Sequence, residues 1–140
     1  MKRKFSAGGV VYKKENGQTF WLLIQPKDTD RWQFPKGAIG AGESSREAAL
    51  RETQEESGVI GRIVEKIGSS SWWFVEDGEK VFKTTTYFLV KAKKDTGRFN
   101  EKEIERVVWF SFGEAKEKLT FNQDKKNLAK AQETLISRLF

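Results

Sequence analysis

Hydrophobic positions near the N-terminus predict a pair of strands. Two short apolar runs, residues 9–12 and residues 20–24, lie on either side of Asn16-Gly17. This dipeptide readily adopts the positive φ angles of a tight hairpin turn, so the two runs are expected to pair. Residues 26–42 contain both prolines and show no regular period, and they are expected to form a loop.

A helical pattern follows over residues 43–58. Helix-forming residues dominate this segment, its serines can cap the N-terminus, and Gly58 can end the helix. Further along, the pattern predicts strands over residues 59–74, 81–90 and 107–110, a short helix over residues 113–119, and a final amphipathic helix on which Leu128, Ala131, Leu135 and Leu139 recur at helical spacing.

These elements follow the order strands, helix, strands, helix, without an internal repeat, a low-complexity tract or a linker. A chain of 140 residues has the length of one ordinary domain. We therefore predict a single α/β domain over residues 1–140, with a mixed sheet and helices packed on it.

Composition narrows the class of protein and its chemistry. Hydrophobic residues make up 37% and charged residues 33% of the chain, which is typical of a globular protein. Because no apolar run approaches the roughly 20 residues of a membrane span, and the N-terminus does not resemble a signal peptide, we expect a soluble cytoplasmic protein without a membrane partner. With no cysteine and no histidine, catalysis would depend on carboxylates, lysines, hydroxyls and a hard metal ion.

The formal net charge of +6 favours anionic partners, which include both nucleic acids and phosphorylated small molecules. Lysines and arginines are scattered along the chain, as on an ordinary solvated surface, and form no evident stripe for duplex nucleic acid. The sequence gives no indication of oligomeric state.

Three glutamates of the first predicted helix carry the candidate chemistry. At about 100° per residue, Glu52, Glu55 and Glu56 lie near 200°, 140° and 240° from Leu50, on the opposite side of the helix. Carboxylates this close repel one another unless a cation neutralises them, and hard oxygen ligands suit Mg²⁺ or Mn²⁺. A water on such a metal would be a candidate nucleophile. The alternative is an acidic helix face that is simply solvated.

The spacing around these glutamates resembles the signature of the Nudix hydrolase family. That signature consists of a glycine, a glutamate after five residues, and an Arg-Glu pair after seven more, followed by Glu-Glu and a glycine. Thr53 departs from the pattern, since a larger apolar residue is usual there. All seven fixed positions match, at Gly37, Glu43, Arg51, Glu52, Glu55, Glu56 and Gly58.

The resemblance implies a Nudix fold, a mixed β-sheet sandwiched between helices (α/β/α), and a Mg²⁺-dependent phosphoanhydride hydrolase. It implies that Glu52, Glu55 and Glu56 bind the metal, with Glu56 or Glu52 also accepting a proton from the attacking water. Arg51 would orient a neighbouring glutamate, and Glu43 would anchor the preceding loop. Gly37 would allow close approach of the backbone. Glu103 is our choice for a further acidic residue from a late loop, although an ordinary surface role fits it equally well.

Further segments resemble the bacterial branch that hydrolyses diadenosine tetraphosphate asymmetrically to ATP and AMP, and this likeness covers most of the chain. It implies that Lys36 and Lys83 hold the polyphosphate. It also implies that Phe121, just before the last helix, contributes to an adenine site. Trp72 and Phe74 share one face of an alternating strand and could stack on a base, although ordinary packing explains them equally well.

Other functions remain open at this point. Related Nudix branches cleave diphosphoinositol polyphosphates, oxidised nucleoside triphosphates, ADP-ribose or the 5′ triphosphate end of RNA, and all use the same metal-binding helix. The net charge favours the inositol substrate slightly, whereas the clustered aromatic residues favour a substrate with a base. A binding module for nucleotides or RNA that has lost catalysis is a further alternative, against which the intact glutamates argue.

Overall fold

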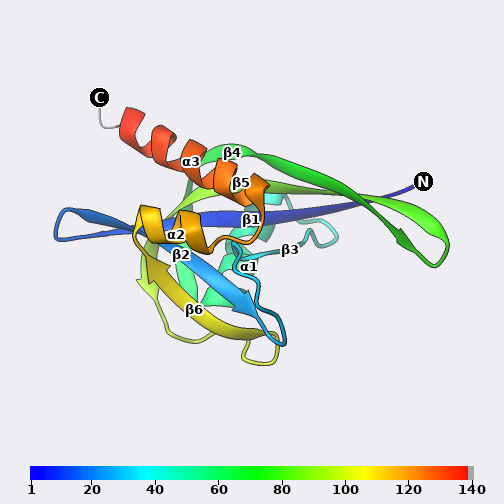
Figure 1. The fold of residues 1–140 in the computed structure, drawn as a ribbon, viewed down its shortest axis with the longest axis horizontal. Helices are drawn as coiled ribbons and strands as arrows, with labels where there is room; N and C mark the ends of the chain where they lie inside the picture. Colours follow the sequence, from blue (N-terminus) through cyan, green and yellow to red (C-terminus); the bar gives the residue numbers. More distant parts are fainter. Residues whose placement is uncertain (139–140) are drawn as a thin grey trace.

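A six-stranded mixed sheet with helices on both sides forms the structure, a computed structural model that describes residues 1–138 (Figure 1). The predicted α/β/α arrangement is confirmed. In chain order the elements are β1 (Lys2–Glu15), β2 (Gln18–Pro26), β3 (Lys36–Ala38), α1 (Ser45–Ser57), β4 (Val59–Glu76), β5 (Glu79–Asp95), β6 (Ile104–Phe110), α2 (Phe112–Lys118) and α3 (Asn122–Ser137).

Strand β1 lies at the centre of the sheet, whose order is β4-β5-β1-β2-β6. It runs parallel to β5 and antiparallel to β2. The predicted hairpin is present, because Asn16 and Gly17 adopt φ angles of 51° and 78° and connect Glu15 to its partner Gln18. The strand is much longer than its predicted apolar part, because its polar N-terminal half also pairs with β5.

The prediction of a loop over residues 26–42 was wrong at β3. Lys36, Gly37 and Ala38 pair with Gly8, Ala7 and Ser6 of β1. The segment is too short for a hydrophobic period, and its hydrogen-bond partners come from about thirty residues earlier in the chain. Tertiary pairing therefore makes it a strand.

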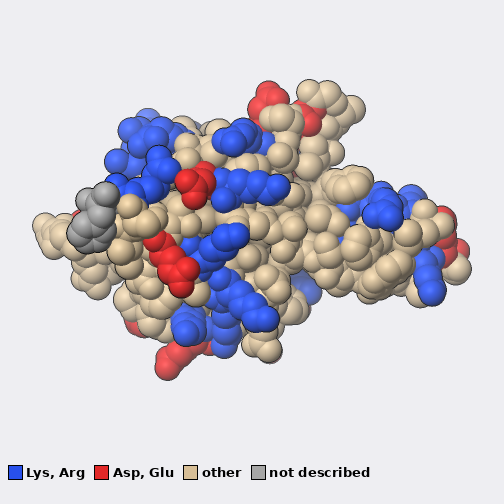
Figure 2. Space-filling view, turned by 90° about the horizontal axis from the view of Figure 1, so that it is seen from above, with Lys and Arg blue, Asp and Glu red and all other residues tan. Residues whose placement is uncertain are grey.

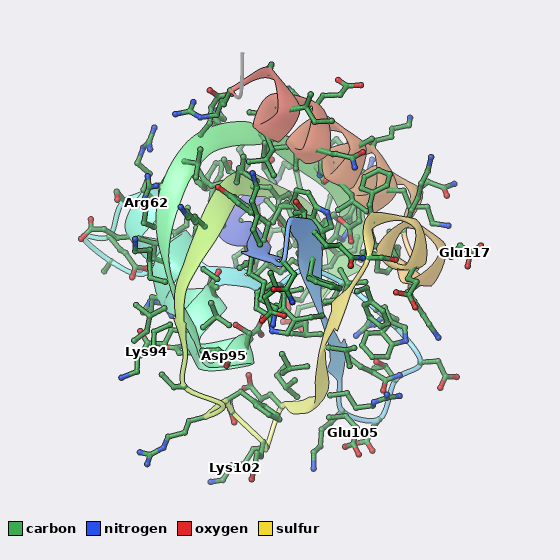
Figure 3. All side chains as sticks on the ribbon, turned by 90° about the vertical axis from the view of Figure 1, so that its left-hand side faces the viewer. Arg62, Lys94, Asp95, Lys102, Glu105 and Glu117 are labelled. Carbon is green, nitrogen blue, oxygen red and sulfur yellow. The ribbon has the colours of Figure 1, made fainter. Side chains whose placement is uncertain are left out.

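Two hydrophobic clusters lie on the two sides of the sheet. One contains Leu128, Ala131 and Leu135 of α3, as the helical spacing predicted, whereas Leu139 lies outside the described residues. The other contains Ala48 and Ala49 of α1. In Figure 1, α3 follows one side of the sheet, and in the end view of Figure 3 it lies above the arching strands β4 and β5. The sheet thus separates α1 from α3.

Helix α1 is fixed at both ends by its sequence. Ser44 accepts a hydrogen bond from the Glu47 backbone, and the Glu47 side chain accepts one from the Ser44 backbone, which completes a capping box. Gly58 ends the helix at φ 80°, and a Cβ there would lie 2.8 Å from the Arg98 backbone nitrogen. Glycine is therefore required at this position by both conformation and space.

The hairpin of β4 and β5 extends beyond the body of the molecule, alongside the N-terminal residues of β1 (Figure 1). Trp72 pairs with Lys83 in this arm, and Trp73 pairs with Phe82. Among residues 1–138, no helix is long and apolar enough to cross a membrane.

Candidate active site

The buried face of α1 is centred on Ala49 and Thr53, both of which are inaccessible to solvent. Leu50, the reference position of the helical projection, is only half-buried and lies at the side of this face. Glu52 and Glu56 consequently lie at the border between the core and the solvent. Both are half-buried, whereas a residue opposite the core would be fully exposed.

Arg51 connects the glutamates of this region. Its guanidinium group donates to both carboxylate oxygens of Glu43, at 2.7 and 2.9 Å, and to Oε1 of Glu52 at 2.7 Å. It also donates to the carboxylate of Glu55 at 3.2 Å and to the Ala38 carbonyl at 2.9 Å. The two hydrogen bonds from Arg51 to Glu43, with a further one from the Gly40 backbone, lower the pKa of Glu43 to about 2. The arginine thus joins α1 to the loop before it and fixes the orientation of the Glu52 side chain.

Glu56 turns toward β3, where its Oε1 atom accepts a hydrogen bond from the Lys36 backbone at 2.8 Å. Burial, together with the smaller effects of the negative charges of Glu52 and Glu103, raises the pKa of Glu56 to about 7, although the hydrogen bond from the Lys36 backbone and the charge of Lys36 lower it. Burial likewise raises the pKa of Glu52, and Glu55 and Glu103 add to that effect. The carboxylates of Glu52, Glu56 and Glu103 therefore share one electrostatic environment.

The segment that carries Glu103 is attached to the end of α1. The Asn100 backbone donates to the Glu55 carbonyl at 2.8 Å, and the Lys27 backbone donates to the Glu103 carbonyl at 2.8 Å. Glu103 is exposed, and its charge acts on Glu52 and Glu56 even though it comes from a loop far along the chain.

Within residues 1–138, no three carboxylates lie together in an arrangement that could hold a metal ion. The reason is visible in the hydrogen bonds, since Arg51 pairs with Glu52 and Glu55 while Glu56 binds the Lys36 backbone. The donor set nevertheless fits a hard divalent cation. The negative charge of Glu52 raises the pKa of the partly buried Glu56, so it is unfavourable for both carboxylates to be ionised. A cation bound between them would offset this repulsion.

Gly37 allows β3 to lie directly against this group. A Cβ atom at Gly37 would overlap the carboxylate of Glu52. Any side chain at this position would have to displace that carboxylate. Gly37 therefore allows the close approach of the backbone that the sequence predicted, and the group it approaches is the carboxylate of Glu52.

A cleft of about 560 Å³ lies next to β3, on the α3 side of the sheet. Of the predicted substrate residues, it brings together Lys36, Trp72 and Phe121. Phe74 lies farther out along the arm, beneath the Nζ atom of Lys4, and does not line the cleft. The cleft is lined by Arg31, Gln33, Lys36, Ser69, Ser70, Ser71, Trp72, Tyr87, Phe121, Gln123 and Asp124.

Two lysines flank Trp72. The Nζ atom of Lys36 lies 5.6 Å and that of Lys83 lies 5.3 Å from the centre of a Trp72 ring. Burial lowers the pKa of both lysines, and the charge of Lys83 lowers that of Lys36 further. Two ammonium groups that repel each other at the edge of a cleft would attract a multiply charged anion.

Sequence reasoning missed two buried polar residues of the cleft, Gln33 and Asp124. Asp124 is only 5% exposed, and burial raises the pKa of its carboxyl to about 6. In the sequence it is one acidic residue in the first turn of a helix, which is a common position for a surface carboxylate. The sequence around Asp124 offers no signal that identifies it as a buried residue of the cleft.

Lys and Arg side chains are spread over the face that carries α3, among uncharged and a few acidic side chains (Figure 2).

Comparisons with known proteins identify the family of this chain. The NUDIX domain profile matches residues 2–132. The MutT4 protein of Mycobacterium tuberculosis is 32% identical over 140 residues, covering 96% of this chain and 56% of that protein. An RNA pyrophosphohydrolase of Stenotrophomonas maltophilia is 38% identical over 65 residues, covering 46% of this chain and 31% of the relative.

Among solved structures, an Ap4A hydrolase of C. elegans in a binary complex superposes with a TM-score of 0.79 at 25% identity, covering 96% of this chain and 98% of that one. The chain spans from about a third to just over half the length of the curated relatives it matches. Because the domain profile covers nearly all of its residues, the chain belongs to the Nudix family.

Proposed function

We propose that this chain hydrolyses a phosphoanhydride in a nucleoside diphosphate linked to another group, and that its substrate is diadenosine tetraphosphate, cleaved asymmetrically to ATP and AMP. The observation that carries this proposal is the position of Lys36. Its backbone nitrogen binds Glu56, while its Nζ atom lies in the cleft over Trp72 and near Lys83. A polyphosphate held by the two lysines would therefore reach the glutamates of α1.

Glu52, Glu55 and Glu56 would hold a divalent cation, which we propose to be Mg²⁺ with Mn²⁺ as an alternative. When bound, such a cation stabilises negative charge on phosphoryl oxygens and makes nearby water more acidic. Glu56 would also accept the proton: burial raises its pKa to about 7 in the absence of a cation, and a bound cation would keep the carboxylate ionised, which is the form that can act as a base.

In the reaction, the oxygen of water forms a bond to one phosphorus atom, and the bond from that phosphorus to the bridging oxygen breaks. The proton of the water passes to Glu56. Arg51 would keep Glu52 in place, and the carboxylate of Glu103 would add a negative charge that acts on Glu52 and Glu56. Lys36 and Lys83 would hold the phosphate oxygens, and Trp72 and Phe121 would contact a base.

The comparisons support diadenosine tetraphosphate more strongly than the 5′ end of RNA, which also has some support. The C. elegans structure is that of an Ap4A hydrolase, and it is similar over almost the whole of both chains. The RNA pyrophosphohydrolases match less than half of this chain, which keeps the 5′ end of RNA as a second candidate substrate. Both substrates carry a base next to a chain of phosphates, in agreement with aromatic residues beside paired lysines.

A hydrolysis panel with products separated by chromatography tests the proposal. It should contain diadenosine tetraphosphate, triphosphorylated RNA, nucleoside triphosphates, ADP-ribose and a diphosphoinositol phosphate. We expect ATP and AMP from diadenosine tetraphosphate, dependent on Mg²⁺. Rapid cleavage of another substrate without turnover of diadenosine tetraphosphate rejects the substrate, and no hydrolysis of any of them favours a binding module.

The variant Glu56→Gln tests the assignment of the site. It should reduce turnover by about 100-fold or more, because the amide keeps the size of the side chain but cannot accept a proton. The melting temperature should not fall, since the substitution removes a partly buried carboxylate whose pKa is raised to about 7. Glu117→Gln is the matched control, since Glu117 points into solvent from α2 (Figure 3). Undiminished activity of Glu56→Gln would remove Glu56 from the mechanism.

A further inference from the structure

Two buried polar side chains face the cleft without a partner in the described part of the chain. Asp124 is 5% and Gln33 is 9% exposed, and both line the cleft. The backbone of Gln33 exchanges two hydrogen bonds with Ile24, at 2.8 and 3.0 Å, and these leave its side-chain amide unused. Within residues 1–138, neither side chain takes part in a hydrogen bond or an ion pair.

Local structure does not account for Asp124. It lies in the first turn of α3, but no side chain forms a hydrogen bond that caps this helix. Lys36 attracts the carboxylate through space, yet burial outweighs this attraction in its effect on the pKa of Asp124. Within residues 1–138, the side-chain atoms that are fully buried without a hydrogen bond belong to Trp21, Thr53 and Thr85, so the polar atoms of Asp124 and Gln33 are still open to the cleft. Two mostly buried side chains whose polar atoms open into one cleft without a protein partner are placed to hydrogen-bond a ligand there.

The chemistry of the two groups defines what that ligand presents. An ionised carboxylate only accepts hydrogen bonds, while a glutamine amide both donates and accepts. Together they match an edge with an N–H donor beside an acceptor nitrogen, which is the pattern of an adenine ring with its exocyclic amino group. Trp72 and Phe121 border the same cleft and offer ring faces for stacking, and Phe121 is 46% exposed.

We infer that Asp124 and Gln33 determine base specificity, and that they recognise the edge of a purine with an exocyclic amino group, Asp124 by accepting a hydrogen bond from that amine. This inference rests on the proposed nucleotide substrate and adds to it. The two lysines bind phosphate in any nucleotide, whereas these two residues distinguish one base from another.

Binding of two nucleotides tests the inference without hydrolysis. The probes are AMP and purine riboside 5′-monophosphate, which differ only in the amino group, and NMR titration in the absence of metal measures their affinities. Wild-type protein at pH 7.5 should bind AMP about 10- to 100-fold more tightly, as expected for a hydrogen bond to a charged group.

In Asp124→Leu this preference should disappear, and in Gln33→Met it should decrease. Glu117→Gln, which changes a carboxylate outside the cleft, should keep the full preference. The melting temperature of Asp124→Leu should equal or exceed that of the wild type, because the aspartate has no partner to lose. A large decrease in its melting temperature would show that Asp124 has a structural role and would overturn the assignment.

The outcomes separate this inference from the proposed function. If the wild type cleaves diadenosine tetraphosphate but binds the two monophosphates equally, the inference fails and the proposed function stands. If the wild type prefers AMP and Asp124→Leu does not, while diadenosine tetraphosphate is not cleaved, the base site stands and the proposed substrate fails. An unchanged preference in Asp124→Leu overturns the inference in either case.

Discussion

Asp124→Asn should stabilise this protein at neutral pH. Burial raises the pKa of Asp124 from its ordinary 3.8 to about 6, so the folded state holds the proton more tightly than the unfolded state does. Well below pH 3.8 both states are protonated and the carboxyl has little effect. As the pH rises from about 4 to 6, the unfolded chain releases its proton more easily, and the folded state becomes less stable relative to it.

The raised pKa corresponds to about 3 kcal/mol of lost unfolding free energy at pH 7.5. Asparagine removes the buried charge and preserves the shape of the side chain. It also removes a negative charge from the first turn of α3, which costs about 0.3–1 kcal/mol. The burial effect is larger, so we expect a net gain of about 2 kcal/mol.

Urea unfolding at pH 4.0 and pH 7.5 measures this gain. Asp124→Asn should be more stable than the wild type at pH 7.5, and the effect of the buried charge should fall to about a fifth of that size at pH 4.0. Asp30→Asn, which replaces an exposed aspartate, should show no comparable pH-dependent gain. A gain of the same size at both pH values, or a loss at pH 7.5, would refute the argument from burial of the charge.

Two further substitutions test the region around Glu52. Arg51→Lys removes the planar group that binds Glu43 and Glu52 together, so kcat should fall by about 10- to 100-fold in steady-state assays. Unchanged kcat would mean that orientation of Glu52 is unimportant. Gly37→Ala places a methyl group where the Glu52 carboxylate lies, and it should reduce activity by a similar factor of about 10 to 100. Gly113→Ala, which meets only open space, should remain fully active, and equal activity of the two alanine variants would contradict the contact.

The sequence predicted the parts of the fold that depend on neighbouring residues. Asn16-Gly17 forms its turn through the φ angles of two adjacent residues, and Gly58 ends α1 through its own left-handed conformation. The glutamates of α1 were identified from their spacing on one helix. These features need no information about which distant segments pack together.

Features that depend on packing could not be predicted in the same way. The strand β3 exists because β1 provides its hydrogen bonds, and Asp124 is buried because the start of α3 lies beside the cleft. The exact rotation of α1 also depends on packing, since Leu50, the reference position of the helical projection, is only half-buried while Ala48, Ala49 and Thr53 are fully buried. In each case, contacts with distant parts of the chain determine the pairing, burial or rotation of a segment, and the local sequence alone does not.

Strand β3 connects the two halves of the proposed site. The carboxylates belong to α1, on one side of the sheet, and the cleft lies on the side of α3. Lys36 contacts both, because its backbone donates to Glu56 and its Nζ atom lies over Trp72, and the next residue, Gly37, lies against Glu52. Since β1 holds these residues by main-chain pairing, the distance from Lys36, proposed to bind phosphate, to Glu56, proposed to be catalytic, is set by the sheet rather than by a flexible loop. In the proposed mechanism, the segment without a recognisable sequence pattern would therefore align the substrate with the glutamates.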